Sequence, residues 1–404
     1  MGGFRYQAVN SRRRRDLTNF LCLALLLTAV NGCSRLHSTG RSAYVYVAVK
    51  QIYLRDHVAL VASRVAQVTN GEKLRVLEQG KHFLKVQTPQ GEIGWLELHA
   101  VIDQNEYNRF MALAQAHASQ PAVATAVLYS EMYVHQEPNR KSQRFYLFAA
   151  NSKVKLLERA SVPRNPPMAG SGLSSTPPGS TQHGVIGRSP SSLKGHKQNF
   201  ESQFLPTVPM EDWWLVRDAA GQTGWILSRD LQVDVPEDVA QYAENERMVG
   251  AYVLRTVSDP DSGKMHGQVP EYLTVLTPYK QGMPFDFDQV RVFTWDVRRH
   301  RYGTAFRQRD VAGFFPVTVT PGGDSQPTAT PGPVFSFERA VDNAVSLDPA
   351  TGVPRASNLE KITYRLEGNL VRRVLPQGEK AAPTQTATGA HPSHRTRRRR
   401  HVHR

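Results

Sequence analysis

Residues 91–101 read GEIGWLELHAV, and residues 221–231 read GQTGWILSRDL. Both contain a Gly-x-x-Gly-Trp turn, and the two turns lie 130 positions apart. Residues 47–78 align with 127–158 at an offset of 80. Residues 83–101, which include the first turn, align with 213–231 at an offset of 130. The change of offset places one insertion of 50 residues in the second copy. The chain therefore carries two copies of one unit, the second of them interrupted.

Each copy has the pattern of a small β domain. Short alternating runs at 74–77, 83–86 and 93–96 are separated by turn residues, which is typical of a small barrel or sandwich. Gly94, and Gly224 in the second copy, are expected where backbone must pass close to a neighbour. Trp95 and Trp225 lie in a late strand and are predicted to be core residues, with a role as ligand platforms as the alternative.

The ordered series of motifs resembles a bacterial SH3 (SH3b) domain. In the first copy the matching positions are Arg55, Ser63, Val65, Val68, Gly71, 74–77, 83–86 and 91–95; in the second they are Phe145, Phe148, 154–157, 213–216 and 221–225. The resemblance implies a barrel of five to seven strands. Such domains are usually appended to cell-wall enzymes or envelope proteins, and they often contact peptidoglycan.

The loop that borders the ligand groove in this family departs from the pattern. The usual Gly-Pro pair is absent from the first copy, which has Asp56, His57 and Val58, and the second copy keeps only Pro138. Ligand binding therefore has to be argued from other residues.

The ligand-binding candidates are Tyr53, Arg55, Tyr133, Trp213 and Trp214. Neighbouring strand residues point to opposite faces, so at least one ring of the Trp213–Trp214 doublet is expected to face outward or into a groove, where it could stack on a sugar or peptide. For the tyrosines, packing against a neighbouring domain is the alternative.

The first residues have the parts of an export signal. Arg12–Arg15 form a basic cluster, an apolar run of about 14 residues follows, and small residues precede Cys33. The stretch 26–33 resembles a bacterial lipoprotein signal, which implies lipidation of Cys33. Ser34 in turn favours the outer membrane or the periplasmic face of the cell envelope. The chain has two cysteines, Cys22 and Cys33, so the predicted exported part offers no pair for a disulfide.

The predicted organisation is mainly β: two small SH3-like barrels with helical linkers, then an antiparallel β-sandwich or barrel. Its boundaries are a signal peptide at 1–32, a tether at 33–43, repeat 1 at 44–103, a helical linker at 104–122, repeat 2 at 123–235 with a disordered insert at 160–210, a helical linker at 236–250, a β-rich domain at 251–378 and a disordered basic tail at 379–404. In the third domain Arg298, Arg299 and Arg301 are expected at a hairpin tip. That tip is either a solvated turn or a surface for an anionic polymer.

Motifs for catalysis are missing from the sequence. It has no cysteine after Cys33, no HExxH, no GxSxG and no phosphate-binding glycine motif. We therefore expect a non-enzymatic protein with no cofactor and no metal, whose partners are membrane lipid through Cys33 and peptidoglycan or an anionic envelope polymer, and not nucleic acid. One alternative is an assembly lipoprotein that docks on envelope proteins. Another is an enzyme using Asp286, Asp288 and Asp310.

Overall fold

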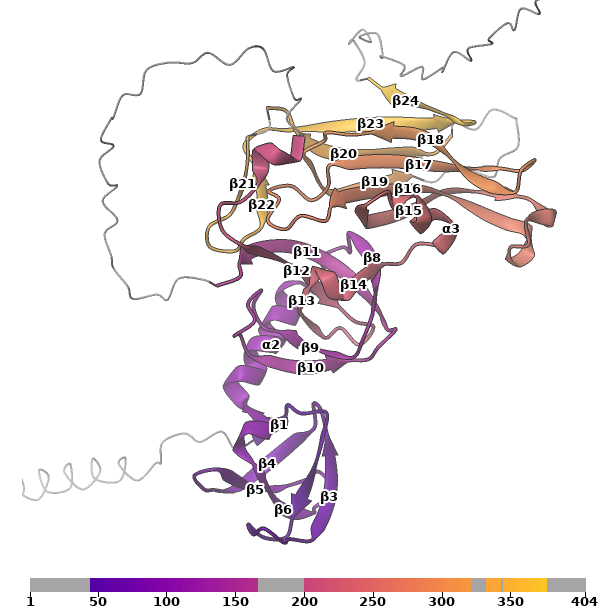
Figure 1. Ribbon diagram of the computed structural model, residues 1–404. Coiled ribbons are helices and arrows are strands. Elements are labelled where there is room, and N and C mark those ends of the chain that lie inside the picture. The colour runs from indigo at the N-terminus through magenta and orange to yellow at the C-terminus, as the bar shows by residue number, and fades with distance from the viewer. Residues whose placement is uncertain (1–43, 166–199, 321–331, 343, 376–404) are drawn as a thin grey trace, which may run out of the picture. The chain divides into compact units, whose positions relative to one another are not determined.

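The computed structural model describes residues 44–165, 200–320, 332–342 and 344–375 (Figure 1). These residues are mainly β with antiparallel sheets and few helices, which confirms the predicted fold class. Cys33, the predicted signal and tether, most of the predicted insert and the basic tail lie outside the described residues. The chain divides into two compact units: one holds Met1–Ser119, Ser130–Ala150 and Arg217–Trp225, and the other holds Gln120–Tyr129, Asn151–Val216 and Ile226–Arg404.

The first repeat forms a seven-stranded sheet in the order β3-β2-β6-β5-β4-β1-β7. Its strands are β1 (Tyr44–Val47), β2 (Gln51–Arg55), β3 (Arg64–Thr69), β4 (Lys73–Gln79), β5 (Phe83–Gln87), β6 (Ile93–Glu97) and β7 (Val101–Asp103). Alternate residues of these strands bury Val45, Leu54, Val68, Leu84 and Leu96 in one core, as a period of two requires. A 3-10 turn, η2 (Leu98–Ala100), precedes β7, and helix α2 (Gln104–Ala116) follows, capped by the Asp103 carboxylate, which accepts from the Glu106 amide at 2.8 Å.

The second repeat has the same strand order, β10-β9-β13-β12-β11-β8-β14, with every strand number raised by seven. Its strands are β8 (Ala124–Leu128), β9 (Met132–His135), β10 (Arg144–Phe148), β11 (Lys153–Pro163), β12 (Met210–Arg217), β13 (Thr223–Leu227) and β14 (Leu231–Val233). The repeated sequence therefore specifies a repeated topology. Both strand orders are open-ended, so within the described residues neither sheet is a closed barrel.

The predicted insert begins later and ends earlier than expected. Strand β11 continues to Pro163, and residues Phe200–Phe204 form a 3-10 turn, η3. The amide of Arg164 donates to the carbonyl of Pro209 at 2.9 Å, so these two ends of the predicted insert lie side by side. An insertion with closely spaced ends interrupts a strand pair at little cost to the fold, because loop-closure entropy grows slowly with length.

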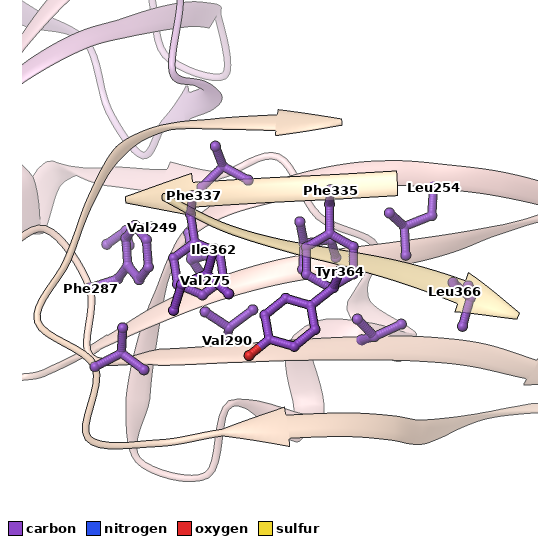
Figure 2. Close-up of a cluster of buried hydrophobic side chains, with 14 residues drawn as sticks. Val249, Leu254, Val275, Phe287, Val290, Phe335, Phe337, Ile362, Tyr364 and Leu366 are labelled. Atoms are coloured by element: carbon purple, nitrogen blue, oxygen red, sulfur yellow. The ribbon is translucent and has the colours of Figure 1, made fainter. Parts of the chain in front are cut away.

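The C-terminal part is a sandwich of two four-stranded antiparallel sheets. One has the order β15 (Glu246–Ser258), β16 (Gln268–Pro278), β17 (Gln289–Asp296), β18 (Arg301–Gln308), and the other β19 (Gly313–Thr320), β20 (Val334–Ala340), β23 (Leu359–Glu367), β24 (Leu370–Val374). Figure 2 shows the shared core, in which Leu254, Val275 and Val290 of the first sheet meet Phe335 and Ile362 of the second. A small pair, β21 (Val345–Leu347) and β22 (Pro354–Ala356), forms a separate ladder.

The second helical linker is shorter than the predicted 236–250. Helix α3 spans only Glu237–Ala240 and continues into a 3-10 turn, η5 (Gln241–Ala243). From Glu246 the chain is already in β15, where Glu246 pairs with Pro278 and Met248 with Leu276. Pairing with β16 therefore overrides the local helical pattern. The remaining short turns are η4 (Ser228–Asp230), η6 (Pro260–Ser262) and η7 (Met265–Gly267).

Candidate ligand groove

A groove of about 540 Å³ opens on the first repeat, and two of the predicted ligand residues line it. Tyr53 and Arg55 come from β2, and Trp95 stands opposite Arg55 on the paired strand β6. This pairing requires the backbones of β2 and β6 to approach each other closely. A Cβ built on Gly94 would lie 2.7 Å from Leu54 Cβ and 3.0 Å from the Arg55 carbonyl oxygen, so glycine is needed beside Trp95.

Cations hold the aromatic rings of this groove. The guanidinium carbon of Arg64 lies 4.3 Å from the centroid of the Tyr53 ring, and Lys85 Nζ lies 5.9 Å from the Trp95 ring. Both rings are partly exposed. Glu97 is the one carboxylate of the lining, and it is 3.1 Å from His99 Nε2. The groove therefore combines aromatic faces with two arginines, which suits a ligand with sugar or apolar faces and carboxylate or phosphate groups.

Trp95 differs from its prediction as a core residue. It is half-buried and lines the groove, whereas Trp225 of the second copy is buried. The two copies keep the same local pairing, since Trp225 stands opposite His135 as Trp95 stands opposite Arg55. A Cβ on Gly224 would likewise meet Val134 at 2.5 Å and the His135 carbonyl oxygen at 3.0 Å.

A second groove of about 520 Å³ in the same compact unit is lined by Tyr133 and is basic. Arg140, Lys141 and Arg144 line it together with His99, and its lining includes no carboxylate. Arg144 lies 5.8 Å from the Tyr133 ring centroid, which repeats the Arg64–Tyr53 pair at the offset of 80. His135 adjoins this region, with Nδ1 3.2 Å from Ser142 Oγ. Burial, with Arg144 adding to it, lowers the pKa of His135, so this imidazole is neutral at pH 7.

The Trp213–Trp214 doublet is not an exposed platform, contrary to the expectation from strand alternation. Trp213 is 1% and Trp214 3% exposed. The two side chains do alternate, but both faces of β12 are covered in this compact unit. Trp214 packs edge-on against Phe315, at 5.8 Å between ring centroids, and both rings line a cavity of about 290 Å³. Phe315 lies 101 positions further along the chain, which is why the local pattern could not show this cover.

The three predicted basic residues do lie at a hairpin end. Arg298 and Arg299 are in the turn between β17 and β18, and Arg301 begins β18 opposite Asp296. Arg299 is 3.8 Å from the Asp296 carboxylate, and His300 Nδ1 is 2.8 Å from Asp259 Oδ2. The side chains are exposed, and nearby carboxylates offset part of their charge.

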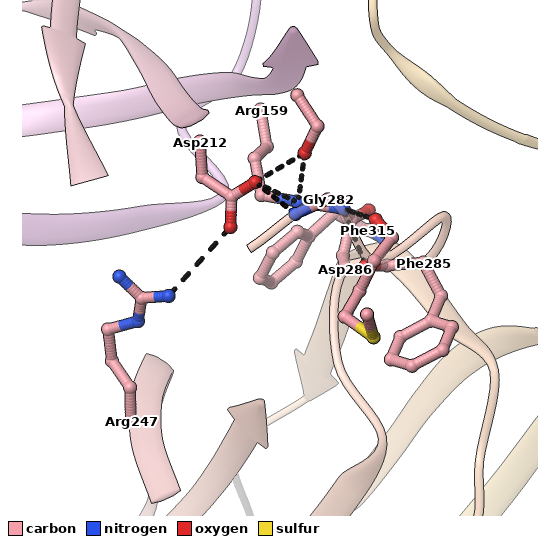
Figure 3. Close-up of polar contacts among 9 residues, drawn as sticks. Arg159, Asp212, Arg247, Gly282, Phe285, Asp286 and Phe315 are labelled. Atoms are coloured by element: carbon pink, nitrogen blue, oxygen red, sulfur yellow. Dashed lines mark hydrogen bonds and ion pairs between the residues drawn. The ribbon is translucent and has the colours of Figure 1, made fainter. Parts of the chain in front are cut away.

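A buried polar network, which sequence reasoning missed, surrounds Arg159 of β11 (Figure 3). Its guanidinium donates to Asp286 Oδ1 at 3.2 Å, to Ser161 Oγ at 2.9 Å, and to the carbonyls of Met283 and Phe285 at 2.7 and 2.6 Å. Asp212 lies 3.4 Å from it and accepts from the amide of Gly282 at 3.0 Å. These bonds attach the segment between β16 and β17 to β11 and β12, which is a structural role.

The three aspartates of the enzyme alternative have different surroundings. Asp286 is engaged by Arg159 and by the amide of Phe315, which donates to its Oδ2 at 3.0 Å. Asp288 is buried, and its Oδ1 has no hydrogen-bond partner among the described residues. Burial, with Glu246 adding to it, raises the pKa of Asp288 to about 7. Asp310 is exposed.

Within the described ranges, no helix combines the length and apolar character that a membrane span requires. Across the same residues, no group of three or more His, Cys, Asp or Glu side chains could hold a metal ion. Both cysteines of the chain lie outside the described part.

No protein-family model matches the chain, and no curated protein matches it. Among solved structures, an NlpC/P60 family protein from Bacillus cereus is similar at 10% identity over 47% of this chain, with a TM-score of 0.21; the chain spans 56% of that protein's length. NlpC2 and NlpC1 from Trichomonas vaginalis are 12% and 10% identical over 80% of this chain and 93% and 89% of theirs, each with a TM-score of 0.14. At scores this low, fold and function rest on the chain's own residues.

Proposed function

We propose that the chain is a non-enzymatic, lipid-anchored protein of the cell envelope whose first repeat binds peptidoglycan or another cell-wall polymer. The groove that holds Tyr53, Arg55 and Trp95 carries this proposal. The rings of Tyr53 and Trp95 are partly exposed, and the arginines of the groove provide donors for anionic groups of a polymer. The resemblance to SH3b domains and the lipoprotein-type signal ending at Cys33 support the same compartment and the same class of ligand.

The lining of this groove favours binding over hydrolysis. It contains no serine, cysteine, histidine or aspartate, and Glu97 is its one carboxylate. General acid–base hydrolysis of a glycan uses a pair of carboxylates, and acyl transfer uses a nucleophile with a neighbouring base. Neither set lines the groove, and this supports the proposed binding role over hydrolysis.

The second repeat adds a basic groove around Tyr133, Arg140 and Arg144. Two sites on one chain gain avidity when one polymer can reach both, without any new contact. Peptidoglycan with attached anionic chains offers both kinds of surface. We therefore assign the aromatic groove to the wall polymer itself and the basic groove to its phosphate or carboxylate groups.

Co-sedimentation with purified peptidoglycan sacculi tests the proposal, using residues 34–377 so that the basic tail cannot bind nonspecifically. Wild type should pellet with sacculi, and Tyr53→Ala should remain in solution. Tyr129→Ala is the matched control, because Tyr129 is 61% exposed but does not line the groove, and it should pellet like wild type. If wild type itself stays in solution, the alternative of an assembly protein that docks on envelope proteins replaces the proposal.

A further inference from the structure

The loop between β2 and β3 holds aliphatic side chains in solvent. Residues 56–63 read DHVALVAS, and Leu60 is 103% exposed and Val61 86% exposed. The neck of the loop is fixed: the Asp56 amide donates to the Ser63 carbonyl at 3.1 Å, and the Ser63 amide donates to Asp56 Oδ1 at 2.9 Å. The apolar residues are thus presented at a tip and are not folded onto the core.

The second repeat supplies an internal comparison for this loop. Residues 136–143 read QEPNRKSQ, and the Gln136 amide donates to the Gln143 carbonyl at 2.9 Å, which is the same neck bond 80 positions later. Arg140 and Lys141 stand where the first copy has Leu60 and Val61. A polar loop of equal length therefore suits the same fold. The fold therefore does not require the apolar side chains of Leu60 and Val61, and exposed apolar residues favour association.

The surroundings of the tip indicate what it contacts. Arg55 and Arg64 are paired across the base of the loop, and both are exposed. Tyr53 and Trp95 line the same groove as Leu60 and Val61. Aliphatic side chains at a tip, tyrosine and tryptophan behind them and arginines beside them form the combination that suits a lipid–water interface with anionic headgroups.

The predicted lipid attachment gives a second reason to choose a bilayer over a protein. Cys33 precedes Tyr44, the first residue of β1, by 11 positions. A chain of that length spans at most about 40 Å when fully extended. A lipid on Cys33 would therefore keep the first repeat within reach of the membrane surface, where weak insertion by a short loop is enough.

We propose that the tip of the β2–β3 loop, Leu60 and Val61, inserts into the interfacial region of an anionic bilayer while Arg55 and Arg64 contact the headgroups. Because Leu60 and Val61 also line the Tyr53 groove, lipid and wall polymer would compete for this face. The first repeat would then switch between the membrane and the wall. Lipid binding at the tip can be tested separately from wall binding, because sacculi contain no bilayer.

A fluorophore at the tip of the full chain tests the insertion. In a Cys22→Ser/Cys33→Ser background, Leu60→Cys is labelled with an environment-sensitive dye, and Arg140→Cys, the equivalent position of the second repeat, is the matched control. On vesicles of equal parts phosphatidylglycerol and phosphatidylcholine, the dye at 60 should shift to the blue and be quenched by a bilayer-embedded quencher, while the dye at 140 should not. Equal responses at both positions, no response at 60, or a shift that grows with protein concentration without vesicles would overturn the proposal.

A second variant separates insertion from nonspecific binding by other parts of the chain. Val58→Asp and Val61→Asp are added to the labelled Leu60→Cys chain, which should still fold because the equivalent loop at 138–141 reads PNRK and has no aliphatic side chain at the equivalent of Val61. The vesicle concentration for half of the maximal shift should rise about tenfold or more, since aliphatic area can no longer leave water. An unchanged midpoint would show that the aliphatic tip does not insert.

Discussion

The guanidinium of Arg64 lies over the ring of Tyr53, 4.3 Å from its centroid, and Arg144 lies over Tyr133 in the second repeat at 5.8 Å. An exposed cation–π pair contributes only about 0.5–1 kcal/mol, which is too little to explain its presence in both copies as a device for folding. The arginine does fix the orientation of a partly exposed ring at the edge of a groove. We infer that the pair is there to present the ring to a ligand.

Removing the arginine should therefore affect binding more than stability. Arg64→Ala should lower the free energy of unfolding by no more than about 1 kcal/mol and still weaken binding to sacculi. Chemical denaturation and a pelleting titration measure the two effects. Arg75→Ala, an exposed arginine of the same repeat outside the groove, is the control and should change neither. Equal binding by both variants would remove Arg64 from the site.

The two close-approach glycines should each reject a methyl group. In Gly94→Ala the new Cβ meets Leu54 and the Arg55 carbonyl oxygen, and in Gly224→Ala it meets Val134 and the His135 carbonyl oxygen. Overpacking against backbone costs about 1–3 kcal/mol, so both variants should unfold at lower denaturant. Gly80→Ala, where the Cβ would meet one atom at 3.3 Å, should cost less. Unchanged midpoints would mean that the strands can move slightly apart at these glycines without loss of stability.

The network around Arg159 should make that residue sensitive to truncation. Arg159→Met leaves Asp286 buried without its cation, while Asp212 keeps Arg247 at 3.8 Å, and breaking a buried pair in this way costs about 3–5 kcal/mol. Arg372→Met is the comparison, because Arg372 lies 3.1 Å from Glu367 in an exposed pair and its loss should cost roughly 1 kcal/mol or less. Thermal unfolding of both variants measures the contrast. Similar losses would show that the network is not specifically stabilising.

The raised pKa of Asp288 predicts a pH-dependent stability. In the folded chain the carboxyl stays protonated up to a pKa of about 7, whereas in the unfolded chain it ionises near its ordinary value. The folded state therefore holds more protons between roughly pH 4 and pH 7, and its stability falls as the pH rises through this window. Asp288→Asn should remove this loss of stability and stabilise the protein at pH 8 by up to about 4 kcal/mol, with little effect near pH 4.

Urea unfolding at pH 4 and pH 8 tests this, with Asp310→Asn as the control. Asp310 is a nearby exposed aspartate with φ of 57°, a conformation that asparagine tolerates. A pH profile of Asp288→Asn identical to that of wild type would mean that the carboxyl is hydrated in the folded state.

Local patterns predicted the strands well. The offsets of 80 and 130 located both copies, and the period-two alternation located the strands of the C-terminal sandwich, because each strand has a face buried against a core. The turn between β23 and β24 falls at Gly368-Asn369, a residue pair typical of hairpin turns, and Gly368 has a φ of 59°. These features depend on residues close in sequence, so the sequence alone carries them.

Burial by distant segments could not be predicted in the same way. Trp214 is covered by Phe315, and residues 246–250 join β15 because β16 lies beside them. Trp95 and Trp225 occupy equivalent positions but differ in exposure, and their own strands give no sign of that difference. The Arg159 network shows the same limit, since three of its partners, Met283, Phe285 and Asp286, lie 124 to 127 positions away.

Hydrogen–deuterium exchange of the chain with and without soluble peptidoglycan fragments tests binding in the Tyr53 groove most directly. Ligand should slow exchange in peptides that cover 51–55, 83–87 and 93–97, and the slowing should disappear in Tyr53→Ala. Peptides from the C-terminal sandwich, such as 289–308, should be unchanged. Protection confined to the sandwich, or no protection anywhere at saturating fragment, would contradict the assignment of the first repeat as a wall-binding domain.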